Sequence, residues 1–164
     1  MSAQSSNENK GLRERTLLIV KPDGVSRGLI GEILGRFERK GLNMVACKLI
    51  TATKAQLEAH YEEHVGRDYF PGILSSTLNM GPMFVFVMEG PVGTVDFARK
   101  MLGKTDPMKS EPGTIRGDLC VSTGRNVCHA SDSVTSATRE ISIWFTEGEL
   151  VNYTPNNAHL LYRE

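Results

Sequence analysis

The chain has 164 residues, the usual size of one domain, and its 19 Lys and Arg residues balance its 19 Asp and Glu residues. This balance excludes the general basic field that non-specific nucleic-acid binding requires, so any anion-binding site must be local. No apolar run approaches the roughly 20 residues that cross a bilayer, and the first ten residues lack the apolar core of a signal peptide.

Three cysteines occur without Cys-x-x-Cys spacing: Cys47, Cys120 and Cys128. An odd number of cysteines does not form a disulfide framework, so reduced thiols are expected. We therefore expect a cytoplasmic protein with neither a membrane nor a specific nucleic acid among its partners.

The first segment, residues 1–10, is polar and cannot bury enough apolar area to offset the entropy of ordering. We predict a disordered N-terminal extension there and a single domain over residues 11–164. Residues 16–20 are a short apolar run that stops at the turn residues 22–24 and predicts a buried strand. Lys21 follows this strand, either as an ordinary lysine at a strand end or as a charge delivered to a site.

The next segments alternate between helical and strand periodicity. Apolar spacing predicts an amphipathic helix over 29–41, a strand over 42–50, and a second helix that opens on the capping box at 53–56. His60 and His64 lie beside the apolar stripe of that second helix at the spacing of a metal-binding pair. Because no third ligand with suitable spacing follows, we interpret them as a surface or core-edge pair.

Further along, residues 67–72 form a loop with two adjacent aromatic residues, and an exposed ring there beside a phosphate site would stack on a base. A short helix is predicted over 73–80. The unbroken apolar run 83–88 predicts a central strand, and helical periodicity returns over 95–102, with Arg99 near the end.

Residues 104–123 are rich in Gly, Pro, Asp and Ser and have no period. Such long loops are uncommon in compact domains unless they serve a function, and this one carries three candidate phosphate-binding residues. These are Thr105, Lys109 and Arg116. A short strand is predicted over 126–130, and residues 147–164 form a tail without a strong period. Between them a helix begins at about Asp132, and its expected apolar face consists of Val134, Ala137, Ile141 and Trp144.

When the extra helix is set aside, this order of elements is β-α-β-β-α-β, the ferredoxin-like arrangement of the α+β class. We predict a four-stranded antiparallel sheet with the helices of the motif on one face, plus an extra helix pair and a long loop. The ends of different strands converge in such a sheet, so Lys21 and His129 can meet at one site.

Residues 124–133 form a polar segment that begins with a glycine and has His129 near its centre. Histidine side chains ordinarily have a pKa of about 6.5, so at neutral pH an imidazole has a free nitrogen lone pair and can act as a nucleophile, a base or a metal ligand. Arg125 and Asn126 are donors suited to an anion or a sugar, and residues 131–133 are of the types that cap helices. The alternative is a hydrogen-bonded histidine near a strand end.

Three segments resemble the nucleoside diphosphate kinase family. They are Lys-Pro-Asp-Gly at 21–24, Pro-Gly-Thr-Ile-Arg-Gly-Asp at 112–118 and Asn-x-x-His-x-Ser-Asp-Ser at 126–133. The resemblance runs from about Arg15 to the last residues. It implies that the γ-phosphoryl group of a nucleoside triphosphate moves to His129 and then to a second nucleoside diphosphate, a ping-pong route with Mg²⁺ on the nucleotide phosphates.

The resemblance also implies roles for individual residues. His129 matches the phosphorylated residue, and Glu140 matches a carboxylate that fixes its tautomer, with Lys21, Tyr61 and Ser131 as further catalytic residues. The implied nucleotide contacts are Lys21, Tyr69, Arg99, Thr105, Arg116 and Asn126. No protein ligand for the metal is implied, and assembly as a homo-hexamer or homo-tetramer is expected.

The chain departs from the family pattern at three positions. Tyr69 stands where phenylalanine is usual, Ala130 stands where glycine is usual, and Thr123 stands near the place of a small apolar residue. An alanine at a position that needed a positive φ would add strain. The alternative function is a catalytically impaired family member that binds nucleotides or serves in assembly. It predicts gaps among the phosphate ligands, and the sequence has none.

Overall fold

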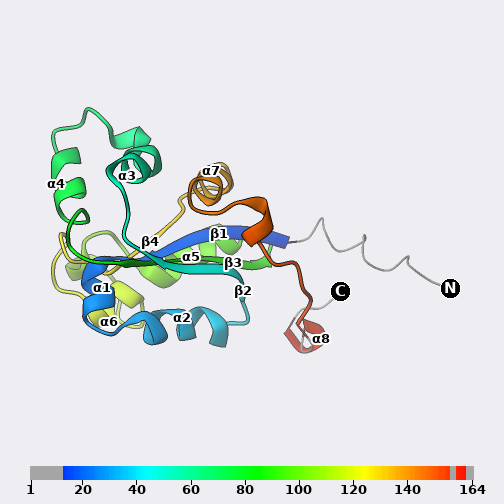
Figure 1. The fold of residues 1–164 in the computed structure, drawn as a ribbon. Coiled ribbons are helices and arrows are strands. Elements are labelled where there is room, and N and C mark those ends of the chain that lie inside the picture. The colour runs from blue at the N-terminus through cyan, green and yellow to red at the C-terminus, as the bar shows by residue number, and fades with distance from the viewer. Residues whose placement is uncertain (1–12, 156–157, 162–164) are drawn as a thin grey trace.

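The computed structural model describes residues 13–155 and 158–161 (Figure 1). The predicted disordered extension, residues 1–10, lies outside the described residues. None of the helices in the described part of the chain is long and apolar enough to cross a membrane.

Four antiparallel strands form one sheet in the order β2-β3-β1-β4. They are β1 (Arg13–Val20), β2 (Asn43–Ile50), β3 (Met83–Pro91) and β4 (Cys128–Ala130). β1 pairs with β3 along its whole length, and its last residues pair with β4, which sets Ile19 opposite His129. The predicted central position of the run 83–88 is therefore confirmed.

Helices cover both faces of this sheet (Figure 1). The helices of the ferredoxin-like motif, α2 (Ile30–Arg39) and α5 (Thr94–Leu102), share one apolar cluster, and the extra pair, α3 (Lys54–His60) and α7 (Val134–Trp144), belongs to the other. Strand side chains alternate between faces, so Leu18 joins the first cluster and Leu17 joins the second. The predicted fold class is confirmed, and the extra pair provides the second layer.

The remaining elements are short. They are α1 (Pro22–Ser26), α4 (Phe70–Ser75), α6 (Ile115–Leu119), α8 (Ala158–Leu161) and the 3₁₀ turns η1 (Glu62–His64), η2 (Pro107–Lys109) and η3 (Glu147–Glu149). The prediction that residues 104–123 lack regular structure is wrong, because η2 and α6 lie within them. Each begins at a side-chain cap, Asp106 or Thr114, and each is too short to produce a helical period.

The predicted apolar face of the last long helix needs one correction. Ala137, Ile141 and Trp144 are buried, but Val134 is 54 % exposed. Val134 is the first residue of α7, and the N-cap hydrogen bond that the backbone N–H of Ser136 donates to Oγ of Ser133 stabilises this turn in place of apolar packing.

Phe37 is expected to be essential for the stability of the first apolar cluster. Its ring is fully buried and packs edge-on against Phe86 at 6.2 Å between centroids. Replacing it with alanine leaves a cavity, so Phe37→Ala should lower the free energy of unfolding by about 3–5 kcal/mol. Urea unfolding at fixed protein concentration measures the change. The control Val92→Ala, at a residue that is 70 % exposed, should stay within about 0.5 kcal/mol of wild type.

Candidate active site

His129 is held by a carboxylate from the neighbouring helix. Its Nε2 atom lies 3.0 Å from Oε2 of Glu140, which is buried on α7. Ser131 is fully buried and donates its hydroxyl to the same oxygen at 2.6 Å. A carboxylate only accepts hydrogen bonds, so neutral His129 carries its proton on Nε2 and keeps the lone pair of Nδ1 free.

Ser131 ties this pair to the centre of the sheet. Its backbone N–H donates to the carbonyl of Leu17 at 3.1 Å, and its Oγ atom accepts the N–H of Leu17 at 3.3 Å. The loop after β4 is thereby fixed to β1, and the N-cap at Ser133 then starts α7 in the direction that returns Glu140 to the histidine.

A chain of polar contacts lies at the other end of β4. Nζ of Lys21, the residue after β1, donates to Oδ1 of Asn126 at 2.8 Å, and Nδ2 of Asn126 donates to the carbonyl of Thr105 at 3.0 Å. These two hydrogen bonds hold Lys21 and Asn126 in fixed positions. Burial lowers the pKa of Lys21, and the nearby charge of Arg116 lowers it further.

Two arginines hold backbone carbonyls of the same strand. Arg116 is buried and donates to the carbonyls of Cys128 at 2.7 Å and Gly103 at 3.3 Å. Arg99 Nη1 donates to the carbonyl of Ala130 at 3.3 Å. Burial lowers the pKa of Arg116, and the nearby charge of Arg99 also lowers it. Among the described residues neither arginine forms a salt bridge with a carboxylate, so both bring positive charge close to β4.

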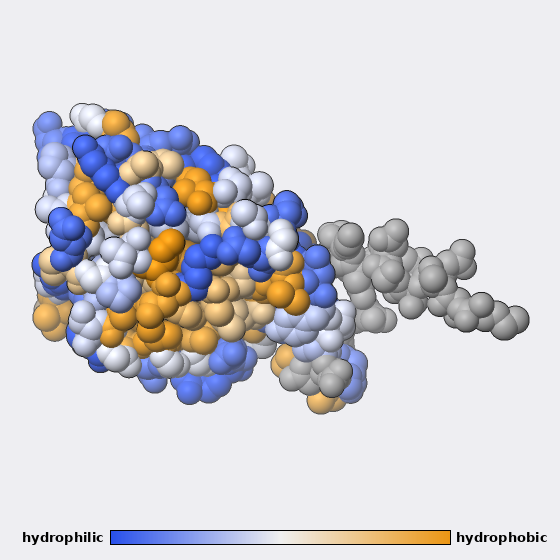
Figure 2. Space-filling model, in the orientation of Figure 1, coloured by the Kyte–Doolittle hydropathy of each residue, from blue (hydrophilic) through white to orange (hydrophobic). Residues whose placement is uncertain are grey.

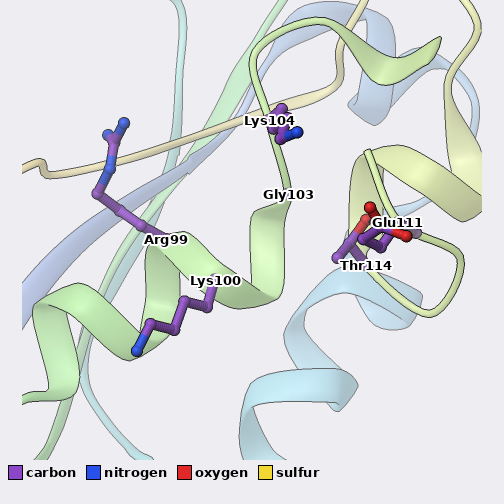
Figure 3. A pocket seen from close by; sticks show the side chains of 6 residues that line it. All are labelled: Arg99, Lys100, Gly103, Lys104, Glu111 and Thr114. Atoms are coloured by element: carbon purple, nitrogen blue, oxygen red, sulfur yellow. Dashed lines mark hydrogen bonds between the residues drawn. The ribbon is translucent and has the colours of Figure 1, made fainter. Parts of the chain in front are cut away.

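A hollow of about 370 Å³ lies beside this region, between α5 and the start of α6 (Figure 3). It is lined by Arg99, Lys100, Gly103, Lys104, Glu111 and Thr114. In the close view the side chains of Arg99 and Lys100 leave α5 in different directions. Of these two adjacent cations, only Arg99 donates a hydrogen bond to β4, the strand that carries His129.

The backbone before His129 is strained. Val127 has φ 56°, a left-handed value that a β-branched residue rarely adopts. Its N–H donates to Oδ2 of Asp23 at 3.1 Å, and its carbonyl accepts the N–H of Lys21 at 2.8 Å. The Lys-Pro-Asp-Gly segment thus clamps β4. Ala130, where strain was considered, is not among the positive-φ residues of the described chain.

The two tyrosines of the predicted site lie at different depths. The ring of Tyr61 lies 6.2 Å from that of His129, and burial, with a further contribution from Glu140, raises the pKa of Tyr61 to about 12. Tyr69 is 56 % exposed, and its hydroxyl lies 2.9 Å from Nδ1 of His64. Tyr61 is therefore part of the histidine's surroundings, whereas Tyr69 offers an open ring at the periphery.

Sequence reasoning placed His60 in a surface or core-edge pair and missed its place in the site. It is 2 % exposed, and its ring meets that of His129 in a T-shaped contact at 4.5 Å between centroids. Trp144 Nε1 donates to its Nδ1 at 3.1 Å. Burial, followed by the neighbouring His129, lowers the pKa of His60 to about 2. Its place directly before Tyr61 was the available signal.

A histidine that donates to a buried carboxylate, with cations close to its strand, suits phosphoryl transfer, and on this fold it defines a phosphotransferase. The family model for nucleoside diphosphate kinase matches residues 14–150, and the chain belongs to this family. A Saccharomyces cerevisiae nucleoside diphosphate kinase is 52 % identical over 149 residues, which cover 91 % of this chain and 96 % of that protein. A Staphylococcus carnosus nucleoside diphosphate kinase is 50 % identical, over 91 % of this chain and 98 % of that protein.

Solved structures show the same similarity. A halophilic nucleoside diphosphate kinase from Halobacterium salinarum, in complex with CDP, has a TM-score of 0.87 and 40 % identity over 92 % of this chain and 99 % of that one. A nucleoside diphosphate kinase family protein from Babesia bovis has a TM-score of 0.85 and 43 % identity, over 91 % of this chain and 99 % of that one.

The low pKa of His60 predicts a loss of stability in acid. The unfolded chain binds a proton at His60 below about pH 6.5, whereas the folded chain does not do so until about pH 2. The stabilising contribution is therefore present above the unfolded pKa and is lost as the pH falls. Between about pH 7 and pH 5 it should account for about 2 kcal/mol of the decrease in unfolding free energy.

Urea unfolding at both pH values, at one protein concentration, measures this effect. His60→Gln is the matched variant, because its amide oxygen can accept the N–H of Trp144 but its side chain does not titrate. Its unfolding free energy should fall by about 2 kcal/mol less than that of wild type. An equal fall in both proteins would contradict the prediction.

Proposed function

We propose that this chain is a nucleoside diphosphate kinase that works through a phosphohistidine at His129. The observation that carries the proposal is the hydrogen bond of His129 Nε2 to Glu140, which leaves Nδ1 as the free nucleophile. An imidazole that is neutral when it attacks and a good leaving group afterwards suits a two-step transfer.

In the first step, Nδ1 of His129 attacks the γ-phosphorus of a nucleoside triphosphate. The N–P bond forms as the bond to the β,γ-bridging oxygen breaks, and the nucleoside diphosphate leaves. The proton on Nε2 remains in place, and Glu140 stabilises the positive charge that develops on the ring. A second nucleoside diphosphate then attacks the phosphorus, and His129 leaves as the neutral imidazole.

The surrounding cations have the electrostatic role in this proposal. Lys21, Arg99 and Arg116 neutralise charge on the phosphates, and their hydrogen bonds to neutral acceptors support the view that they are held in place beforehand. Tyr61 packs beside the nucleophile, and Ser131 keeps Glu140 oriented.

The remaining predicted contacts concern the nucleoside and its phosphates. We assign Asn126 to the sugar and phosphates, and Thr105, an exposed residue at the end of the same contact chain, to a phosphate oxygen. The exposed ring of Tyr69 supports base stacking, which tolerates any base because every base has a π-face. The CDP complex of the Halobacterium relative agrees with nucleotide binding.

Mg²⁺ enters the proposal as part of the nucleotide substrate. It prefers oxygen ligands and retains several waters, and it is commonly bound through substrate phosphates. The side chains gathered at His129 are mainly cations and N–H donors, and Glu140 already accepts hydrogen bonds from His129 and Ser131. These residues fit a nucleotide that brings its own ion better than a protein-built magnesium cage.

The domain boundaries, the cellular location and the oligomeric state also remain predictions. We propose one domain over residues 11–164, a cytoplasmic location in keeping with three free cysteines, and a homo-oligomer of six or four chains. An apolar area in the middle of the face in Figure 2 supports association between copies. The alternative, a nucleotide-binding or assembly protein without catalysis, is disfavoured because every predicted phosphate-binding residue is present.

The decisive test is the intact mass after mixing the protein with ATP and Mg²⁺. Wild type should gain one acid-labile phosphoryl group and lose it when a different nucleoside diphosphate is added in excess. His129→Ala should gain none, because it lacks the nucleophile. Wild type that binds nucleotide but gains no mass would favour the non-catalytic alternative.

Arg99 and Lys100 form a matched pair for testing the phosphate contacts. Both are exposed cations at the end of α5, but only Arg99 donates to the His129 strand. Arg99→Ala should reduce kcat/KM roughly 100-fold, the usual effect of removing one charge-stabilising donor. Lys100→Ala should stay within about twofold of wild type. Steady-state transfer assays measure both, and equal losses would mean that only the general positive charge matters.

A further inference from the structure

His60 lies against the nucleophile, but the proposed mechanism gives it no role. It ends α3, and its ring meets that of His129 at 4.5 Å between centroids and 72° between planes. It also meets Tyr61 edge-on at 4.5 Å. Its Nε2 atom is buried and has no hydrogen-bond partner among the described residues. A buried polar atom without a partner is costly, so its retention calls for an explanation.

Trp144 determines which nitrogen of His60 carries the proton. The indole N–H can only donate, and it donates to Nδ1 of His60 at 3.1 Å. Nδ1 must therefore be the acceptor, and the proton of neutral His60 must be on Nε2. Protonating Nδ1 would set two N–H groups against each other in a buried place. His60 is thus held in one neutral tautomer.

The same bond bears on metal binding. His60, His129 and Glu140 each offer one ligand atom, and these atoms lie within 4.8 Å of one another. A metal at Nε2 of His60 would require its proton to move to Nδ1, where the N–H of Trp144 already points. Metal-binding histidines donate their second N–H to an acceptor, whereas the partner here is itself a donor. The polarity of this pair therefore disfavours a three-ligand metal site.

We propose that His60 is a positioning residue that holds the ring of His129 with Nε2 on Glu140 and Nδ1 free for the phosphoryl group. This inference rests on the proposed function. One hydrogen bond does not by itself stop an imidazole from rotating about its side-chain bonds. The ring of His60 occupies the space beside that of His129, and with Tyr61 it limits this rotation.

Neutrality is the second part of this role. Attack by Nδ1 makes the ring of His129 more positive, and a positive charge on a ring 4.5 Å away would oppose that change. Trp144 keeps His60 neutral without adding a charge of its own. The Trp144–His60 pair therefore places a fixed, uncharged ring against that of His129.

The test compares His60→Ala and Trp144→Phe with wild type. His159→Ala is the control, because His159 lies exposed on α8. Rapid-quench mass spectrometry measures the rate of phosphohistidine formation in a single turnover with ATP and Mg²⁺, and equilibrium titration with ADP measures nucleotide affinity. Long-range ¹H–¹⁵N NMR of ring-labelled protein reads the tautomers of His60 and His129.

We expect His60→Ala to slow phosphorylation at least about 10-fold, as misplacing a reacting group does, with ADP affinity within about twofold of wild type. The NMR signals of His129 should change from the Nε2–H form to a mixture of tautomers. In Trp144→Phe the tautomer of His60 should become mixed, and phosphorylation should slow by about threefold. His159→Ala should match wild type.

A wild-type rate in folded His60→Ala would overturn the proposal, as would a loss carried wholly by weaker ADP binding or an unchanged His129 tautomer. If His60→Ala does not fold, Trp144→Phe decides. An unchanged His60 tautomer together with a wild-type rate would then refute it. If wild type itself is not phosphorylated, the proposed function fails, and the His129 tautomer in the variants still tests positioning.

Discussion

The carboxylate of Glu140 is the contact on which the site depends. One of its oxygens accepts from both His129 and Ser131, and Ser131 in turn exchanges hydrogen bonds with Leu17 in a central strand. A single buried group thus joins α7, the loop after β4 and the middle of the sheet. Because a carboxylate only accepts hydrogen bonds, it also determines the tautomer of the histidine. Stability of the fold and orientation of the nucleophile are therefore coupled through Glu140.

The strand that carries His129, β4, is too short for sheet pairing alone to fix its position. β4 has three residues, and within the described residues β1 is the one strand it pairs with, so its position depends on contacts from outside the sheet. Arg116 and Arg99 hold carbonyls of this strand, and Asp23 holds the strained residue before it. The same arginines are those proposed to bind phosphate, so the scaffold and the proposed binding surface use common side chains.

The sequence predicted what depends on repeated local pattern. The three longer strands, the three long amphipathic helices and the α+β class follow from apolar runs and apolar periodicity, and the capping box at Thr53 marked the start of α3 correctly. α6 was not predictable in this way, since five residues between Thr114 and Cys120 leave no period to detect. The prediction that Val134 is buried was wrong because apolar periodicity does not show at which residue a helix first contacts the sheet.

His60 shows why part of the site was beyond reach. By its spacing in the sequence His60 was grouped with His64. In the structure its ring contacts His129 and Trp144, which are 69 and 84 positions further along the chain. A contact between distant segments depends on how the two layers pack, which a single sequence does not state. Family motifs identified His129, Glu140 and the cations, whereas a residue outside those motifs emerged only from the three-dimensional arrangement.

The unpaired arginines beside β4 affect how a polyanion first meets this protein. Elsewhere in the described residues the arginines commonly face carboxylates, as Arg13 and Arg15 face Glu89. Arg99 and Arg116 face carbonyl groups instead, so a chain with no net charge still carries a local positive field. Dissolved ions weaken the exposed part of such a field over a Debye length of about 8 Å at physiological ionic strength. Diffusional capture of a highly charged ligand therefore depends on ionic strength, whereas the internal geometry of the site, fixed by short hydrogen bonds, is much less sensitive to it.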